Sequence, residues 1–128
     1  MKKILIGAAL LLVLTACGAG ESGGSYTAVD TETAKAMMDE DPEVLVLDVR
    51  EQDEYDSGHI AGAVLLPVGT IDADTAAAVI PETDAAVLVY CRSGNRSKTA
   101  SQTLADLGYT AVYEFGGVRD WPYGLVTD

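Results

Sequence analysis

The segment best suited to chemistry is a short loop that contains one cysteine and two arginines. Its seven residues read CRSGNRS, from Cys91 to Ser97. An apolar run at 86–90 precedes the loop, and a helix-forming segment follows it. Because Gly94 and Asn95 tolerate unusual backbone angles, successive N–H groups can turn inward and form a concave anion-binding nest. The pattern predicts that Cys91 lies at the base of this nest.

Cationic side chains are concentrated around this cysteine. Arg92, Arg96 and Lys98 follow it closely, although the whole chain has 8 Lys and Arg residues against 20 Asp and Glu. A helix N-terminus and nearby arginines lower the pKa of a cysteine thiol well below its free value of about 8.5. We therefore expect Cys91 to be a thiolate at neutral pH without a histidine base. The only histidine in the sequence is His59.

Apolar runs that alternate with helix-forming segments must position the loop. Strands are predicted at 26–29, 44–47, 63–66, 86–90 and 110–113, and helices are predicted at 31–41, 75–80 and 97–107. Continuous apolar runs are typical of strands that are buried on both faces. The alternation predicts an α/β fold, an open parallel sheet with helices on both faces. Ligands of such sheets bind beyond the carboxyl ends of the strands, where the Cys91 loop lies.

Separated motifs of this chain resemble the rhodanese family. The motifs are DVRE at 48–51, EYDSGHIAGA at 54–63, the Cys91 loop with its preceding strand, and the segment with Gly116, Gly117 and Trp121. They occur in the same order as in that family, and the resemblance covers nearly all of the chain from about Tyr26. It implies a single rhodanese-like α/β domain that moves sulfane sulfur.

The resemblance implies thiosulfate sulfurtransferase activity by covalent catalysis. Cys91 would attack the outer sulfur of a small anionic donor such as thiosulfate and become a persulfide. Cyanide or a thiol would then accept the sulfur. The candidate substrate-binding residues are Arg92, Ser93, Gly94, Asn95 and Arg96. This chemistry requires neither a metal nor an organic cofactor.

Several polar and aromatic residues outside the loop are interpreted as structural. Asp48 and Arg50 are expected to pair and to support the end of a strand near the loop. His59 is interpreted as a hydrogen-bonded structural residue, and Trp121 as a packing residue. The acidic run 51–56 is interpreted as a solvated helix face.

Composition and loop length exclude several other classes of function. The formal net charge of −12 argues against a nucleic-acid partner, which needs a basic face. One histidine and two cysteines are too few for the usual four-ligand zinc site. A phosphatase or arsenate reductase loop has five residues between cysteine and arginine, whereas four separate Cys91 from Arg96. A thioredoxin-like role lacks a resolving cysteine beside Cys91.

The N-terminus has the three parts of an export signal. Lys2 and Lys3 precede an apolar run of 11 residues at 4–14, which is shorter than the roughly 20 residues of a membrane-spanning helix. The sequence Leu-Thr-Ala-Cys at 14–17 follows and resembles a bacterial lipoprotein signal. The resemblance implies cleavage before Cys17 and attachment of acyl chains, such as palmitate, to that cysteine.

These features divide the chain into a signal peptide (1–16), a lipidated cysteine with a flexible tether (17–25) and a rhodanese-like domain (26–128). The expected location is extracytoplasmic, with the protein anchored to the lipid bilayer of a bacterial cell envelope. The expected function is therefore that of a membrane-anchored sulfurtransferase. The alternative is a membrane-tethered sulfur carrier or binding module without turnover. The sequence identifies no protein partner.

Overall fold

The computed structural model describes residues 24–128. The predicted signal peptide (1–16), Cys17 and most of the predicted tether lie outside the described residues. The described chain contains a five-stranded sheet in the order β1-β5-β4-β2-β3, and all neighbouring strands pair in parallel. The strands are β1 (Thr27–Ala28), β2 (Leu45–Asp48), β3 (Val64–Leu65), β4 (Val87–Cys91) and β5 (Val112–Gly117). The predicted parallel α/β architecture is therefore confirmed.

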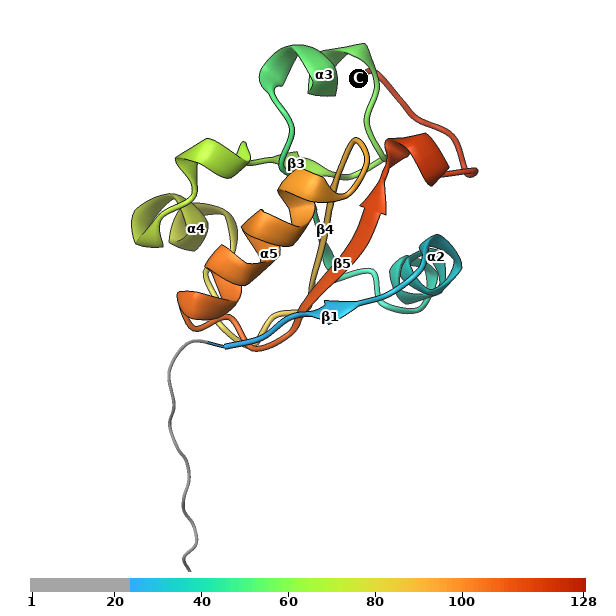
Figure 1. Ribbon diagram of the computed structural model, residues 1–128. Coiled ribbons are helices and arrows are strands. Elements are labelled where there is room, and N and C mark those ends of the chain that lie inside the picture. The colour runs from blue at the N-terminus through green and yellow to red at the C-terminus, as the bar shows by residue number, and fades with distance from the viewer. Residues whose placement is uncertain (1–23) are drawn as a thin grey trace, which may run out of the picture.

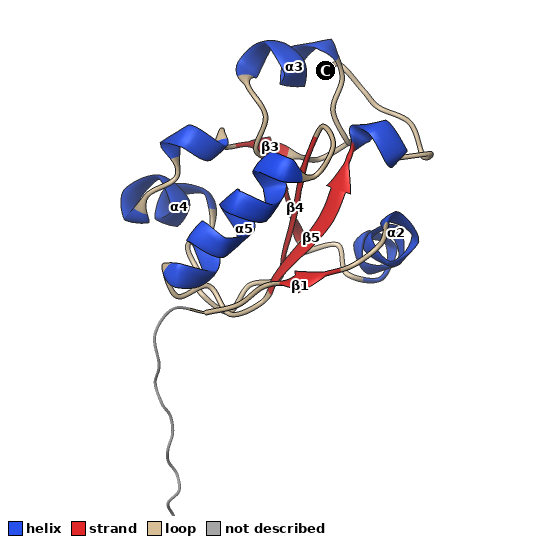
Figure 2. Ribbon diagram, viewed as in Figure 1, coloured by secondary structure: helices blue, strands red, loops and turns tan. Residues whose placement is uncertain are grey.

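Helices cover both faces of this sheet (Figures 1 and 2). α2 (Thr31–Glu40) packs on one face, whereas α4 (Ala73–Val79) and α5 (Asn95–Asp106) pack on the other. The remaining helices are α3 (Gln52–Ser57) and the short 3-10 helices η2 (Val68–Thr70) and η3 (Val118–Asp120). No helix within residues 24–128 is long and apolar enough to cross a membrane.

The central strand β4 carries the loop of interest at its carboxyl end. All five of its residues are buried, because β2 and β5 pair with its two edges and helices cover its two faces. The side chains of Val87 and Val89 belong to the core under α5, whereas Leu88 and Tyr90 belong to the core under α2. Cys91 is the last residue of the strand, so a rigid element positions its side chain.

Two predicted boundaries differ from the structure at the elements that surround the loop. The last strand was predicted at 110–113, but β5 is Val112–Gly117. A glutamate and two glycines, which are depleted in strands, made the sequence beyond 113 look unlike a strand. Pairing with β1 and β4 nevertheless incorporates them. α5 also begins two residues before the predicted start at 97, because Gly94 adopts a left-handed conformation with φ of 111° and serves as its N-cap.

Candidate active site

The Cys91 loop forms the predicted nest around the sulfur atom. Sγ of Cys91 accepts a hydrogen bond of 3.0 Å from the backbone N–H of Gly94. Sγ also lies 3.5 Å from Oγ of Ser97, in the first turn of α5. The Cys91 residue is only 1% exposed, and the opposite side of the thiol packs against the core under α5. The sulfur atom therefore lies between an apolar core and a set of hydrogen-bond donors.

The pKa of the Cys91 thiol reflects a competition between burial and hydrogen bonding. Burial alone would raise this pKa, because a thiolate loses hydration in the interior. The neutral thiol donates to the Ser97 hydroxyl, and once the thiol has lost its proton this hydroxyl and the backbone N–H groups of Ser97, Gly94 and Ser93 are the donors that favour the anion. These donors prevail, so the pKa of Cys91 is lower than its usual value. A lowered pKa agrees with the expectation from the sequence.

The structure places the five predicted substrate-binding residues in different surroundings. Gly94 is buried and its N–H points at the sulfur. Arg92, Ser93 and Asn95 are exposed. The guanidinium of Arg96 forms a two-point ion pair with Glu54. Binding of a donor by these side chains stays a prediction.

The partner of Arg96 is a carboxylate from the acidic run, and sequence reasoning missed it. Nη1 and Nη2 of Arg96 donate to Oε1 and Oε2 of Glu54 over 2.8 and 2.9 Å. Such parallel bonds are stronger and more directional than a single contact. The interpretation of 51–56 as a solvated helix face was therefore wrong at Glu54, which lies 42 residues before Arg96 in the chain. The ion pair connects α3 to the start of α5.

Replacing Glu54 by Gln is expected to change the acid stability of the protein. The hydrogen bonds from Arg96 lower the pKa of Glu54 from 4.5 to about 2. A lowered pKa stabilises the folded state above pH 4.5, and this stabilisation disappears as the pH falls towards about 2. Glu54→Gln should therefore cost about 1 kcal/mol near neutral pH and nothing below about pH 2. Urea unfolding as a function of pH measures this difference.

The exposed residue Glu43 provides a matched control for this experiment. Glu43→Gln removes the same charge without touching an ion pair in the described residues. We expect its stability to follow that of the unmodified protein across the acid range. An equal loss of stability in both variants, or a Glu54→Gln effect that persists unchanged at pH 2, would contradict the role of the ion pair.

A buried polar network supports the end of β2 beside the loop. The guanidinium of Arg50 donates to both oxygens of the Asp48 carboxylate, with a shortest distance of 2.7 Å. It also donates to the carbonyl of Gly58, and the hydroxyl of Tyr90 donates to Asp48 over 2.7 Å. The Tyr90 hydroxyl in turn accepts a hydrogen bond from the backbone N–H of Ile60. The network therefore links β2, β4 and the segment after α3.

The predicted structural roles of His59 and Trp121 agree with their surroundings. The ring of His59 is buried and stacks on Tyr55, with ring centroids 3.7 Å apart. Its Nδ1 lies 2.9 Å from the carbonyl oxygen of Tyr55. Trp121 packs against Phe115 within the core under α2. Among the hydrogen bonds and ring contacts of the described residues, neither of these side chains meets Cys91.

Gly117 allows β5 to pass close to the Cys91 loop. A Cβ atom at this position would collide with the carbonyl of Arg92 and would lie 2.6 Å from the carbonyl oxygen of Cys91. Gly117→Ala should therefore displace the loop and cost about 2–3 kcal/mol of stability. Gly69→Ala is the control, because a Cβ at Gly69 meets nothing within 4 Å. Thermal unfolding checks both variants, and equal stability of the two would contradict the close approach.

A buried carboxylate behind the loop is a second residue that sequence reasoning missed. Glu114 in β5 is only 3% exposed. Its Oε2 accepts a hydrogen bond of 2.6 Å from the Ser97 hydroxyl and one of 2.8 Å from the N–H of Gly116. Glu114 lies just beyond the strand predicted at 110–113, so no alternating pattern marked it as an inward-facing residue. Glu114 completes a chain of polar groups that begins at Cys91.

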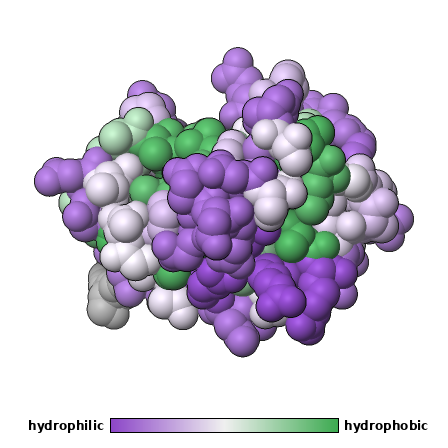
Figure 3. Space-filling view, turned by 90° about the horizontal axis from the view of Figure 1, so that it is seen from above, coloured by the Kyte–Doolittle hydropathy of each residue, from purple (hydrophilic) through white to green (hydrophobic). Residues whose placement is uncertain are grey.

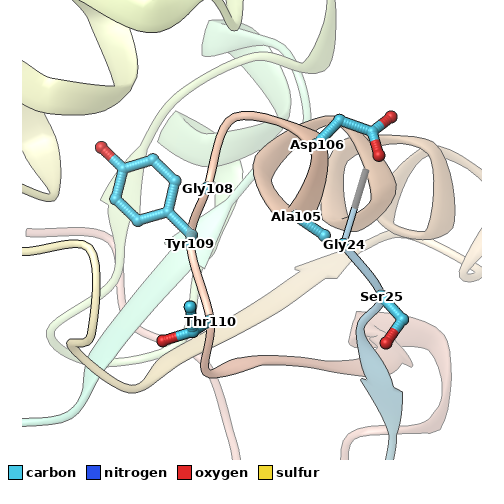
Figure 4. A pocket seen from close by; sticks show the side chains of 7 residues that line it. All are labelled: Gly24, Ser25, Ala105, Asp106, Gly108, Tyr109 and Thr110. Carbon is cyan, nitrogen blue, oxygen red and sulfur yellow. The ribbon is translucent and has the colours of Figure 1, made fainter. Parts of the chain in front are cut away.

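A pocket of about 420 Å³ lies away from this site (Figure 4). Its lining residues are Gly24, Ser25, Ala105, Asp106, Gly108, Tyr109 and Thr110. These residues surround the far end of α5, about 18 Å along the helix axis from the Cys91 loop. No residue of the Cys91 loop lines this pocket, so the pocket is separate from the candidate active site.

Within residues 24–128 no group of three or more His, Cys, Asp or Glu side chains is arranged to hold a metal ion.

The end of the domain that carries the loop has a mixed surface. Seen from above, hydrophilic residues cover much of this face, and hydrophobic residues form separate patches between them (Figure 3). The exposed large hydrophobic residues of the described chain include Val64 and Leu125. The face of the domain that carries the Cys91 loop therefore combines polar residues with separate apolar patches.

The fold and the site together define a class of protein. It is an α/β domain in which a cysteine ends a central parallel strand and is held in a nest of backbone N–H groups at a helix N-terminus. The chain belongs to the family of rhodanese-like domains, whose pattern matches residues 30–122.

Comparison with individual proteins agrees with this assignment. The chain is 34% identical over 102 residues to the putative sulfur carrier protein YrkF of Bacillus subtilis, a match that covers 79% of this chain but 54% of YrkF. It is 36% identical over 74 residues to the thiosulfate sulfurtransferase PspE of Escherichia coli, covering 58% of this chain and 70% of PspE. The chain thus spans about half the length of YrkF and 70% of the length of PspE.

Solved structures show the same fold. A structure described as a rhodanese with anions from E. coli superposes with a TM-score of 0.62 at 30% identity, over 66% of this chain and 99% of that chain. A rhodanese-related protein from Thermoplasma volcanium superposes with a TM-score of 0.64 at 28% identity. That match covers 80% of this chain and 100% of the other.

Proposed function

We propose that this protein is a sulfurtransferase that moves sulfane sulfur from a donor such as thiosulfate to cyanide or a thiol through a persulfide on Cys91. The single observation that carries the proposal is the Cys91 sulfur held by the N–H of Gly94, with a lowered thiol pKa. Two relatives of similar sequence support it, because PspE and GlpE of Coxiella burnetii are both named thiosulfate sulfurtransferase.

The transfer divides into two displacements at sulfur. In the first, the Cys91 thiolate forms a bond to the outer sulfur of thiosulfate, and the bond from that sulfur to the sulfonate group breaks. Sulfite leaves with the electron pair, and the negative charge of the persulfide lies on the outer sulfur. In the second, cyanide or a thiolate bonds to the outer sulfur and the electron pair returns to Sγ. Because Cys91 is only 1% exposed, small sulfur donors and small acceptors are favoured over large ones.

Mass spectrometry of the protein after incubation with thiosulfate tests this function directly. We expect one additional sulfur atom on the peptide that contains Cys91, and we expect cyanide to remove it with release of thiocyanate. Treatment with a thiol such as reduced glutathione should remove the same atom. Absence of the added sulfur with thiosulfate and with a polysulfide donor would refute the proposal.

A sulfur carrier without turnover is the second candidate function. The observation that favours it is the relative YrkF, whose name is putative sulfur carrier protein. Both functions require the Cys91 persulfide, but they differ in what happens next. Repeated release of thiocyanate from excess thiosulfate and cyanide supports the enzyme. A single release per protein molecule supports the carrier.

We further propose that acyl chains on Cys17 anchor the domain to an extracytoplasmic bilayer of the bacterial cell envelope. The sequence Leu-Thr-Ala-Cys after an apolar run of 11 residues supports this location. Cys17→Ser is expected to abolish labelling by a palmitate analogue and to release the protein from the membrane fraction or leave its precursor uncleaved. Unchanged labelling and unchanged membrane association of this variant would argue against the anchor.

A further inference from the structure

The described chain enters the domain at the end of α5 that lies opposite to the reactive cysteine. The carbonyl of Gly24 accepts a hydrogen bond of 2.9 Å from Nε2 of Gln102. A Cβ at Gly24 would lie 2.7 Å from the carbonyl oxygen of Ala105, so the backbone of Gly24 packs directly against the last turn of α5. Figure 4 shows this contact. We call this region the entry end and define it by Gly24, Ser25, Thr110 and the last turn of α5.

The entry end and the Cys91 loop lie at opposite ends of the domain. The paired strands of the sheet are all parallel, and they run from the entry end towards the loop. Cys91 pairs with Gly117 where the ladder between β4 and β5 ends. α5 has 12 residues, which separate its two ends by about 18 Å. The loop and the first described residues therefore face in opposite directions (Figure 1).

The entry end carries acidic side chains and lacks cations. The backbone N–H of Thr110 donates to the carbonyl of Thr83 over 3.0 Å, which brings the segment 82–85 beside the entry end. The described segments 24–28, 81–86 and 105–111 contain no Lys or Arg, and their exposed carboxylates are Glu82, Asp84 and Asp106. Anionic lipid headgroups attract basic segments, so they do not attract this surface. Only a covalent anchor would hold the entry end close to a bilayer.

The end of the domain that carries the loop has no excess of positive charge. The guanidinium of Arg96 is paired with the carboxylate of Glu54. The exposed cations of this end are matched in number by exposed carboxylates of α3 and its N-cap: Arg92, Lys98 and Arg119 against Glu51, Asp53 and Asp56. Surface charge therefore supplies no strong force that would turn the loop towards a bilayer.

We propose that, in the anchored protein, the entry end faces the bilayer and the Cys91 loop faces the aqueous compartment. The inference rests on the proposed acyl anchor at Cys17. Gly24 follows Cys17 by seven positions, and a stretch of this length spans at most about 25 Å. An inverted domain would hold Gly24 about 18 Å or more from the bilayer and would require most of that length. The proposed orientation requires none of it.

This orientation determines which molecules can reach the reactive sulfur. Donors and acceptors that are dissolved in water would approach the Cys91 loop without obstruction. A donor or acceptor that is embedded in the bilayer would meet the entry end, where the pocket-lining residues include no cysteine. The orientation therefore assigns water-soluble sulfur compounds, and not membrane-embedded ones, as the substrate class.

Energy transfer from tryptophan to a labelled lipid tests the orientation, because the chain has one tryptophan. Trp121 follows β5 near the loop, where the N–H of Arg119 donates to the carbonyl of Arg92. The acylated protein is incorporated into phosphatidylcholine vesicles that contain a dansyl-labelled lipid. The double variant Trp121→Phe with Ser25→Trp moves the tryptophan to an exposed position at the entry end. We expect several-fold more efficient transfer in the double variant, because transfer falls steeply with distance.

Alkylation of Cys91 gives a second readout that needs no substitution within the domain. Iodoacetamide dissolved in water should label Cys91 on vesicles as fast as it does in Cys17→Ser, which lacks the anchor. Slower labelling on vesicles, or transfer from Trp121 that equals or exceeds that of the double variant, would overturn the orientation and leave the anchor and the sulfurtransferase standing. Failure of the protein to associate with vesicles would instead refute the anchor, and the orientation with it.

Discussion

Cys91→Ser is expected to lower the rate of thiocyanate formation from thiosulfate and cyanide by at least about 10³-fold, to the background without protein. A serine hydroxyl is un-ionised at neutral pH and is a poor nucleophile towards sulfur. The Gly94 N–H and the Ser97 hydroxyl that stabilise the Cys91 thiolate would then face a neutral oxygen. The variant should also fail to gain sulfur in the mass spectrometer. Its thermal unfolding should stay close to that of the unmodified protein, because the substituted side chain differs by one atom.

The other cysteine of the chain supplies a matched control. Cys17→Ser is the same substitution at a position outside the described residues and far along the sequence from the loop. With purified protein and soluble substrates, we expect it to retain the full rate of transfer. If Cys91→Ser kept a tenth or more of the activity, the persulfide would not lie on the pathway. If both variants lost activity equally, the loss would have to arise from handling of the protein.

Arg50→Met is expected to destabilise the folded protein by about 3–5 kcal/mol, the largest loss of stability among the substitutions considered. Asp48 is fully buried and Arg50 is 4% exposed. Removing the guanidinium leaves the Asp48 carboxylate in the interior with the Tyr90 hydroxyl and one backbone N–H as its remaining donors. These neutral donors compensate a buried charge incompletely. Urea unfolding near neutral pH measures the loss.

Two further variants separate this effect from a general effect of charge. Lys35 forms an exposed ion pair with Asp39, four residues later on α2. Lys35→Met should cost about 0.5 kcal/mol or less, since exposed helix pairs contribute little. The double variant Asp48→Asn with Arg50→Met removes both charges and should recover part of the stability that Arg50→Met loses. Equal costs for Lys35→Met and Arg50→Met, or no recovery in the double variant, would contradict the network.

Short-range pattern was sufficient to predict the architecture and the reactive cysteine. The apolar runs that become β2 and β4 are continuous, and such runs form strands only where both faces are covered. The glycine at 94 and the helix that follows it indicated a nest, and the N–H of Gly94 does donate to Cys91. These features depend on neighbouring residues, so the sequence around them contains the necessary information.

Long-range pairing decided which charged groups belong to the site. The sequence of this protein by itself determined an α/β domain of the rhodanese-like family with a thiol at the end of a buried strand. It did not show that Arg96 binds Glu54, 42 residues away, or that Glu114 reaches Ser97 from β5. Polar side chains carry no periodic signal that identifies a distant partner, since the energy of an ion pair or buried hydrogen bond depends on distance and burial. Only the tertiary structure, which places β5 and α3 beside the start of α5, sets those two quantities.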